Sequence, residues 1–170
     1  MFIIEKELSL EGKLLTRVIK KKMGFVPKHF ELFASLNPAR LKMYLQELEY
    51  ISTHKNIEPD FFTFIRLAVA SKEGFEYCIN LNRQILLTRG YTKEQLDALL
   101  KQNELPLNSK HKALFVATLD AMRKAESFTK ESVDSLLNLG WSYEDIWDAL
   151  DHGAFLYKYA KILEAFLTKE

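Results

Sequence analysis

The sequence predicts an all-α protein, folded as a single helical domain that spans residues 1–170. Apolar side chains recur at helical spacing in successive segments, which is the primary signal of amphipathic helices. Six glycines and four prolines are few for 170 residues, and most of them stand where a helix is expected to begin or end. This length fits one domain with its own buried core.

The first three helices are expected before residue 55. Residues 13–23 place four apolar side chains on one stripe, and Gly24 suits the left-handed stop after it. Pro27 opens a short helix that runs through Leu36. Asn37-Pro38 then combines an N-cap with a first-turn proline and starts a helix to about His54.

The middle of the chain is expected to hold the central helix of the core. Pro59 starts this helix, and residues 61–70 are apolar nearly all round, with Arg66 the only charge among them. A helix that is apolar on every side belongs inside the core. Gly74 interrupts it, and a further helix is expected from about Phe75 to Arg89.

A repeat follows, in which Leu86–Leu96 resembles Leu136–Ile146. Each copy reads as a helix end, a glycine, an aromatic residue, a Ser or Thr N-cap and a new helix, and Gly90 and Gly140 stand 50 residues apart. Thr92 with Gln95 forms a capping box, and the second copy has a weaker analogue. The repeat indicates either an internal duplication or two helix corners that use the same chemistry.

The last three helices are expected over about 110–125, from Thr129 to Gly140, and from Tyr143 nearly to the end. The last of them carries apolar residues on two faces. Such a helix must bury both faces, either inside the core or against a second subunit.

The charge balance does not favour nucleic acid or a membrane as a partner. Lysine and arginine number 24 against 23 acidic residues, a net charge of +1, which offers no argument for nucleic acid or an anionic membrane. Lys20, Lys21 and Lys22 are interpreted as complementing a helix C-terminus rather than as a nucleic-acid patch. No targeting segment and no apolar run of the ~20 residues that a membrane span needs is found, so a cytoplasmic protein is expected.

The single cysteine and the scattered histidines limit the chemistry. One cysteine excludes a disulfide, a cysteine-based zinc site and a Cys-x-x-Cys redox pair within one chain. The four histidines have no ligand spacing, so no metal is expected. No Gly-rich phosphate loop or nucleophile elbow occurs, and no cofactor is expected.

Two pairs of residues could carry chemistry. Cys78 and Asn82 lie one turn apart on a stripe that is otherwise apolar. Cys78 is either a reactive thiolate near a helix N-terminus or an inert core residue, and Asn82 reads as a satisfied buried amide. Asp148 and His152 stand at i and i+4, as a carboxylate–histidine pair facing a pocket or as a surface ion pair.

Several segments resemble one known family. The matching residues are Met23–Pro27, Leu36–Pro38, Phe64–Cys78, Gly90–Leu96 and Gly140–Ile146. They resemble the carboxymuconolactone decarboxylase / alkyl hydroperoxidase D superfamily, in its peroxidase-related branch, over about residues 23–165. The resemblance implies an all-helical fold that assembles into homo-oligomers, from a dimer to a hexamer.

The resemblance also implies a site, most of whose residues differ in this chain. Hydroperoxidase members of the family use a glutamate and the motif Cys-x-x-Cys-x-x-x-His to reduce peroxide. Placed on this sequence, the glutamate position is Thr63, the two cysteine positions are Phe75 and Cys78, and the histidine position is Asn82. Only Cys78 matches, so the paired-thiol reaction is expected to be lost.

Four functions follow as hypotheses. The first is a binding or structural homo-oligomer with a small apolar pocket at Thr63, Phe75, Cys78 and Asn82. The second is a one-cysteine, peroxiredoxin-type antioxidant enzyme that uses Cys78. The third is a cofactor-free acid–base enzyme for a small lactone-like substrate, with His152 or Asp148. The fourth is an unrelated helical interaction module. The sequence does not decide whether the chain is an enzyme.

Overall fold

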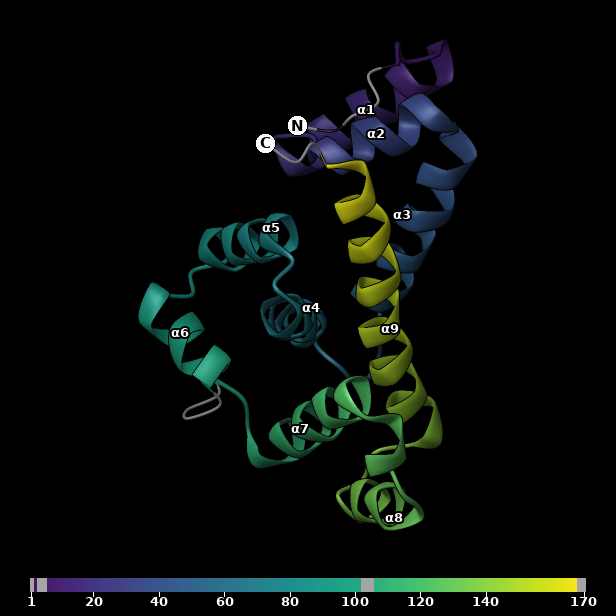
Figure 1. Ribbon diagram of the computed structural model, residues 1–170. Coiled ribbons are helices and arrows are strands. Elements are labelled where there is room, and N and C mark those ends of the chain that lie inside the picture. The colour runs from purple at the N-terminus through teal and green to yellow at the C-terminus, as the bar shows by residue number, and fades with distance from the viewer. Residues whose placement is uncertain (1, 3–5, 102–105, 168–170) are drawn as a thin grey trace. The chain divides into compact units, whose positions relative to one another are not determined.

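The computed structural model describes residue 2, residues 6–101 and residues 106–167. Over these residues the chain forms nine α-helices and one 3-10 helix, so the all-α prediction is confirmed (Figure 1). The helices are α1 (Leu10–Met23), α2 (Lys28–Leu36), α3 (Pro38–Ser52), α4 (Pro59–Glu73), α5 (Glu76–Thr88), α6 (Lys93–Lys101), α7 (Ser109–Arg123), α8 (Lys130–Asn138) and α9 (Tyr143–Phe166), with the 3-10 helix η1 at Ala125–Ser127.

The helices group into two compact units. One unit contains residues 1–53 and 162–170, and the other contains residues 54–161. A single domain over residues 1–170 stays a prediction.

The first unit contains α1, α2 and α3. Helix α1 begins three residues before the expected start, because the Ser9 side chain caps it by accepting a hydrogen bond from the Gly12 backbone N–H at 3.1 Å. Four rings pack edge to face or tilted in the core of this unit, those of His29, Phe30, Phe33 and Tyr44. Leu10, Leu14 and Val18 form an exposed stripe along α1.

The second unit is built around α4. Figure 1 shows α4 along its axis, with α5, α6 and α7 around it. Nine of its fifteen residues are buried, which confirms the expected central helix. Gly74 ends the helix in the left-handed conformation at φ 72°.

The two predicted corners share one geometry. The Tyr91 and Trp141 N–H groups donate to Leu86 O and Leu136 O, both at 3.2 Å. Both capping pairs are reciprocal: Thr92 with Gln95 at 2.8 and 3.2 Å, and Ser142 with Asp145 at 2.8 and 3.0 Å.

The structure extends the repeat to whole helices. Helices α4 and α7 each have 15 residues, and α7 begins 50 residues after α4. Side-chain contacts repeat as well: Tyr91 Oη donates to Asp60 at 3.0 Å, and Trp141 Nε1 donates to Lys110 O at 3.1 Å. Asp60 and Lys110 are also 50 residues apart. The repeat therefore relates two helix pairs, α4 with α5 and α7 with α8.

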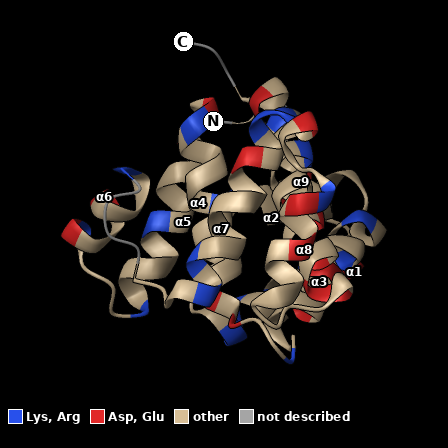
Figure 2. Ribbon diagram, turned by 90° about the horizontal axis from the view of Figure 1, so that it is seen from below, with Lys and Arg blue, Asp and Glu red and all other residues tan. Residues whose placement is uncertain are grey.

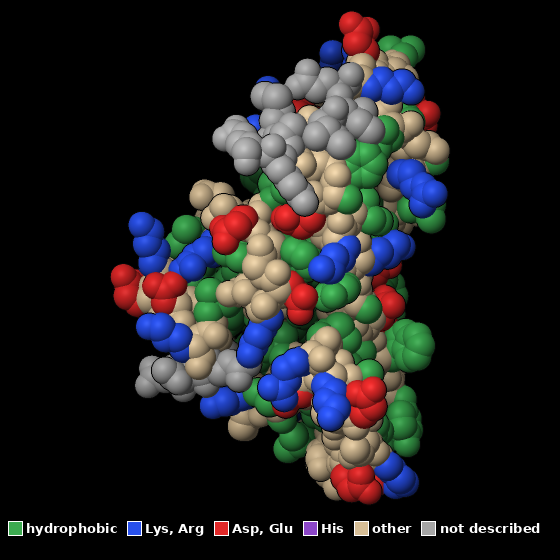
Figure 3. Space-filling model, in the orientation of Figure 1, with side chains coloured by type: hydrophobic (Ala, Val, Ile, Leu, Met, Phe, Trp, Pro, Cys, Tyr) green, Lys and Arg blue, Asp and Glu red, His purple; other side chains and the backbone are tan. Residues whose placement is uncertain are grey.

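The surface carries both signs of charge. Lysines and arginines are interspersed with aspartates and glutamates along the helices in Figure 2, and the face in Figure 3 shows the same mixture among apolar side chains. In the part of the chain that the structure describes, no helix is long and apolar enough to cross a membrane.

Candidate functional site

Arg66 gathers three predicted site residues around its guanidinium. Nε donates to Asn82 Oδ1 at 2.9 Å, Nη1 lies 2.7 Å from His152 Nε2, and Nη2 donates to Thr63 Oγ1 at 2.8 Å. We call these four residues the Arg66 hub. Thr63, Asn82 and His152 are buried, at 0%, 2% and 0% exposure, so the guanidinium joins their polar groups in the core of the second unit.

Three helices position the hub. Thr63 and Arg66 are three residues apart on α4 and therefore share one face. Asn82 comes from α5, and its Nδ2 donates to the Cys78 carbonyl at 2.8 Å, which directs its Oδ1 to Arg66. His152 comes from α9.

His152 is neutral in the hub. Burial, and then the Arg66 charge, lower its pKa well below the ordinary value. Because Nε2 accepts from Arg66, we assign the imidazole proton to Nδ1. Its ring stacks on Phe155 and meets Phe62 edge to face, both with centroids at 5.2 Å. His152 Nδ1 has no hydrogen-bond partner within the described residues.

The protonation state of His152 determines whether its ring can act as a general base or as a hydrogen-bond donor. The lone pair that a general base needs is on Nε2 and already accepts from Arg66. The Nδ1–H group can still donate a hydrogen bond. The arrangement therefore leaves His152 a hydrogen-bond donor through Nδ1 and not a general base.

The two cysteine positions of the family site, Phe75 and Cys78, are both buried. Cys78 is 5% exposed and contributes its backbone carbonyl to Asn82. Phe75 is buried against Tyr157, with ring centroids at 6.0 Å and the Lys161 ammonium 5.1 Å from the Phe75 ring centroid. The polar group between Thr63 and Asn82 is thus the Arg66 side chain, and an apolar pocket at these residues stays a prediction.

Asp148 and His152 do not form the expected pair. Asp148 Oδ2 lies 3.2 Å from His54 Nε2, whereas His152 Nε2 lies against Arg66. Both alternatives for the pair, one facing a pocket and one on the surface, were therefore wrong. The reason is that spacing along α9 does not show which side chains other elements bring to the helix.

His54 belongs to a second polar cluster. Its Nδ1 accepts from the backbone N–H groups of Asn56 at 3.2 Å and Ile57 at 3.0 Å, so Nε2 faces the carboxylates of α9. Burial raises the pKa of Asp145, but hydrogen bonds from Ser142 and Asn56 outweigh it and hold that pKa below its ordinary value. This cluster attaches the segment before α4 to α9.

A third cluster flanks the hub. Arg89 forms an ion pair with Asp60 and also lies 3.4 Å from Thr63 Oγ1. Burial and the hydrogen bond to Asp60 raise the pKa of Tyr91 to about 12, so the phenol stays protonated and donates. A cavity of about 140 Å³ lies beside these groups and is also lined by His111.

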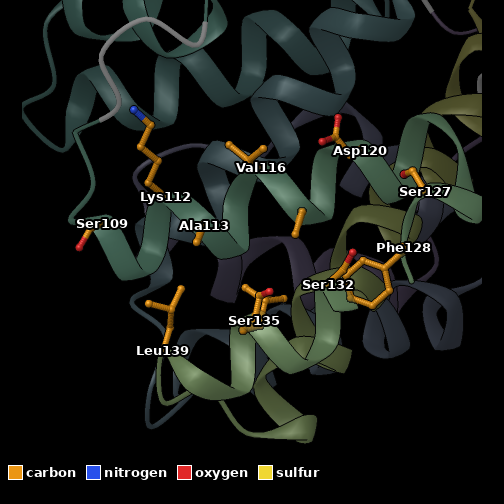
Figure 4. A pocket seen from close by; sticks show the side chains of 12 residues that line it. Ser109, Lys112, Ala113, Val116, Asp120, Ser127, Phe128, Ser132, Ser135 and Leu139 are labelled. Atoms are coloured by element: carbon orange, nitrogen blue, oxygen red, sulfur yellow. The ribbon is translucent and has the colours of Figure 1, made fainter. Parts of the chain in front are cut away.

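A larger groove lies between α7 and α8. It has a volume of about 520 Å³ and is lined by Ser109, Lys112, Ala113, Val116, Ala117, Asp120, Ser127, Phe128, Ser132, Ser135, Leu136 and Leu139 (Figure 4). We call it the α7–α8 groove. Figure 4 shows Lys112 toward one end of α7 and Asp120 toward the other, with Ala113 and Val116 between them.

Metal chemistry finds no support in the residues described. Among residues 6–101 and 106–167, no three side chains of His, Cys, Asp or Glu are grouped so that they could hold a metal ion.

Arg66 is the functional residue that the sequence interpretation missed. In the sequence, Arg66 stands as the single charge in an apolar run, and a lone charge in a helix that is buried all round must find polar partners. That requirement is the signal that could have identified it. The identity of the partners needs the tertiary structure, since Asn82 and His152 come from other helices.

Solved structures that are similar to this chain include two peroxidase-related proteins and one protein of unknown function. An uncharacterised peroxidase-related protein from Silicibacter sp. TM1040 aligns with a TM-score of 0.84 and 16% identity over 95% of this chain and 85% of its own. An uncharacterised peroxidase-related protein with an alkylhydroperoxidase AhpD core, from Ralstonia eutropha JMP134, has a TM-score of 0.80 and 16% identity, with 96% and 87% covered. A protein of unknown function from Agrobacterium tumefaciens has a TM-score of 0.64 and 17% identity, with 81% and 94% covered. No protein-family model and no curated protein matches the sequence.

At these identities the similarity shows the fold. The chain has the fold of the peroxidase-related, AhpD-like proteins, and the family resemblance that was read from its sequence is confirmed at that level.

Proposed function

We propose that this chain keeps the AhpD-like fold without paired-thiol peroxide chemistry, and that it acts as a self-associating binding protein. The observation that supports this most directly is the guanidinium of Arg66, bonded to Thr63 and Asn82. The family resemblance assigns these two positions to the glutamate and histidine of the peroxide-reducing site. Neither threonine nor asparagine titrates near neutral pH, and a guanidinium does not release its proton in proteins.

The thiol chemistry points the same way. Cys78 is the only cysteine in 170 residues, so a sulfenic acid formed on it would find no second thiol within the chain. Phe75 stands at the other cysteine position and packs on Tyr157. Cys78 is also buried, which limits access of peroxide to its sulfur.

The hub indicates the class of ligand. His152 presents a neutral Nδ1–H donor, and the guanidinium places a positive charge beside it. Both favour a small molecule that accepts hydrogen bonds, a carbonyl compound or a carboxylate, over a cation. The cytoplasmic location and the homo-oligomer expected from the sequence belong to this proposal.

A peroxide assay tests the loss of thiol chemistry. The protein is incubated with hydrogen peroxide or an organic hydroperoxide, with and without a small dithiol, and the Cys78 thiol is then titrated under denaturing conditions. We expect one intact thiol per chain and no peroxide consumption beyond that of a Cys78→Ser control.

The opposite result has a definite meaning. If Cys78 is oxidised faster than a free thiol and turnover is lost in Cys78→Ser, the protein is a one-cysteine peroxidase and the proposal fails. Sedimentation velocity tests the other half, because a strictly monomeric chain would contradict self-association.

A further inference from the structure

The α7–α8 groove is the counterpart, in the second repeat, of the Arg66 hub in the first. The offset of 50 residues relates Val116 to Arg66, Ala113 to Thr63 and Ser132 to Asn82. All three counterparts line the groove. The same faces of the repeated helices therefore form the Arg66 hub in the first repeat and the α7–α8 groove in the second repeat.

The two faces differ in what covers them. In the first repeat, α9 lies on this face, because His152 bonds to Arg66 and packs edge to face on Phe62. In the second repeat, Ala113 and Val116 are half-exposed and a groove of about 520 Å³ lies over them. The comparison between the repeats indicates that the open face has the shape to receive a helix.

The residues that line the groove determine which side chains a docked helix should carry. The Ser127 and Ser135 hydroxyls donate to backbone carbonyls, both at 2.7 Å, so neither hydroxyl requires a polar partner from an occupant of the groove. Lys112 and Asp120 stand eight residues apart on α7, about 12 Å along its axis. The groove therefore fits a helix with an apolar stripe of about two turns, an acidic residue at one end and a basic residue at the other.

Helix α1 carries a stripe with these properties. Leu10, Leu14 and Val18 follow one another at four-residue spacing and are 77%, 53% and 54% exposed. The first and third are also eight residues apart, so the stripe has the same length of about 12 Å. Glu7 precedes it, and Lys21 and Lys22 follow it within one turn.

We propose that α1 of a second copy of this chain docks in the α7–α8 groove. The N-terminal end of the docked α1 lies toward Lys112, and its lysines lie toward Asp120. The contact of these lysines with Asp120 replaces the exposed 3.6 Å ion pair between Asp120 and Arg123. Each chain carries both surfaces, so the same contact can form between any two copies. This inference rests on the proposed self-association and identifies its surface.

Cross-linking between two different chains tests the contact. In a Cys78→Ala background, one chain carries Leu14→Cys and the other, with a mass tag, carries Val116→Cys. After mixing and mild oxidation we expect a disulfide-linked heterodimer. A matched control replaces Val116→Cys by Lys93→Cys, on the exposed start of α6, and gives no such product.

Charge reversal tests the orientation on an otherwise native chain. Asp120→Lys is expected to weaken association about tenfold, since one unfavourable charge pair costs on the order of 1.4 kcal/mol. The triple variant that adds Lys21→Glu and Lys22→Glu restores it, as measured by sedimentation velocity.

The outcomes separate the two proposals. An oligomer that forms no Leu14–Val116 cross-link overturns the docking surface and leaves the proposed function in place. A cross-link that forms only within one chain carrying both cysteines shows that α1 fills its own groove and overturns the second copy as occupant. A monomer contradicts self-association itself, while the peroxide assay decides the thiol chemistry independently.

Discussion

Nη1 of Arg66 lies 2.7 Å from Nε2 of His152, although the two residues are 86 positions apart in the sequence. The contact joins α4 to α9 inside the second unit, and it pairs a permanent cation with a neutral acceptor. Since the same guanidinium also reaches α5 through Asn82, one side chain connects three helices at the position where the family resemblance places redox chemistry.

Removing the Arg66 side-chain charge should destabilise the second unit. Arg66→Met deletes three hydrogen bonds and leaves the buried Asn82 Oδ1 and His152 Nε2 without their donors. Each unsatisfied buried group costs about 1–3 kcal/mol, so we expect the free energy of unfolding to fall by roughly 3 kcal/mol in urea titrations. Arg66→Lys should not restore it, because one ammonium cannot reproduce the guanidinium fork.

A surface arginine provides the control. Arg123 is 68% exposed and, among the described residues, forms a 3.6 Å ion pair with the exposed Asp120, so Arg123→Met should change the free energy of unfolding by less than about 0.5 kcal/mol. Equal losses in the two variants would mean that the hub hydrogen bonds add no stability.

Stability should fall as the pH drops below about 6.5. The folded pKa of His152 is well below its ordinary value, whereas the unfolded imidazole regains that value. As the pH falls, the imidazole of the unfolded chain therefore binds its proton before the folded one does. The stabilisation of the folded state by neutral His152 is complete above the unfolded pKa and is lost as the pH falls below it. We expect a slope of up to about 1.4 kcal/mol per pH unit between pH 6.5 and 5, measured by urea unfolding.

The variant His152→Gln isolates this slope, because the amide oxygen can still accept from Arg66 but does not titrate. The free energy of unfolding of this variant should depend less steeply on pH, by up to about 1.4 kcal/mol per pH unit, because one fewer proton is bound on unfolding. Burial also lowers the pKa of His111, with a smaller contribution from Lys110, so a weaker dependence of the same sign remains. An unchanged slope in His152→Gln would show that His152 is not held neutral by the fold.

The helices could be predicted because their signals are local. Asn37 caps α3 through Ala39 N–H at 3.0 Å, and Gly74 and Gly90 have the positive φ that a helix stop requires. Each of these signals acts within a few residues of sequence. The missed 3-10 helix at Ala125–Ser127 has no such signal, since its three residues carry no cap or apolar period.

The candidate site could be predicted only in part. Thr63, Asn82 and His152 were each named from the sequence, and the structure places them around one guanidinium. The pairing between them was not foreseen, because helical spacing determines which face a residue shares but not which distant helix packs on that face. Arg66 itself required the argument that a buried charge must be paired.

The repeat predicts equal responses at its two corners. Gly90 and Gly140 have φ values of 94° and 83°, which L-residues adopt at a cost, and no atom lies closer than 3.7 Å to a Cβ added at either. Gly90→Ala and Gly140→Ala should therefore each lower the free energy of unfolding by about 1–2 kcal/mol through backbone strain alone. A difference of more than about 1 kcal/mol between them would argue that the corners are not energetically equivalent.

A double-mutant cycle distinguishes the partner of Asp148 that the sequence suggested from the one in the structure. Asp148 lies 3.2 Å from His54 Nε2, in a cluster in which both side chains are at most 10% exposed. Residues in contact show coupling energies of about 0.5–3 kcal/mol, so Asp148→Asn with His54→Gln should be non-additive by about 1 kcal/mol or more. Asp148→Asn with His152→Gln should show the smaller coupling of the two cycles, because His152 bonds to Arg66 instead. Strong coupling in the second cycle, with additivity in the first, would mean that Asp148 pairs with His152, one helical turn away. It would contradict a neutral His152 that accepts a hydrogen bond from Arg66.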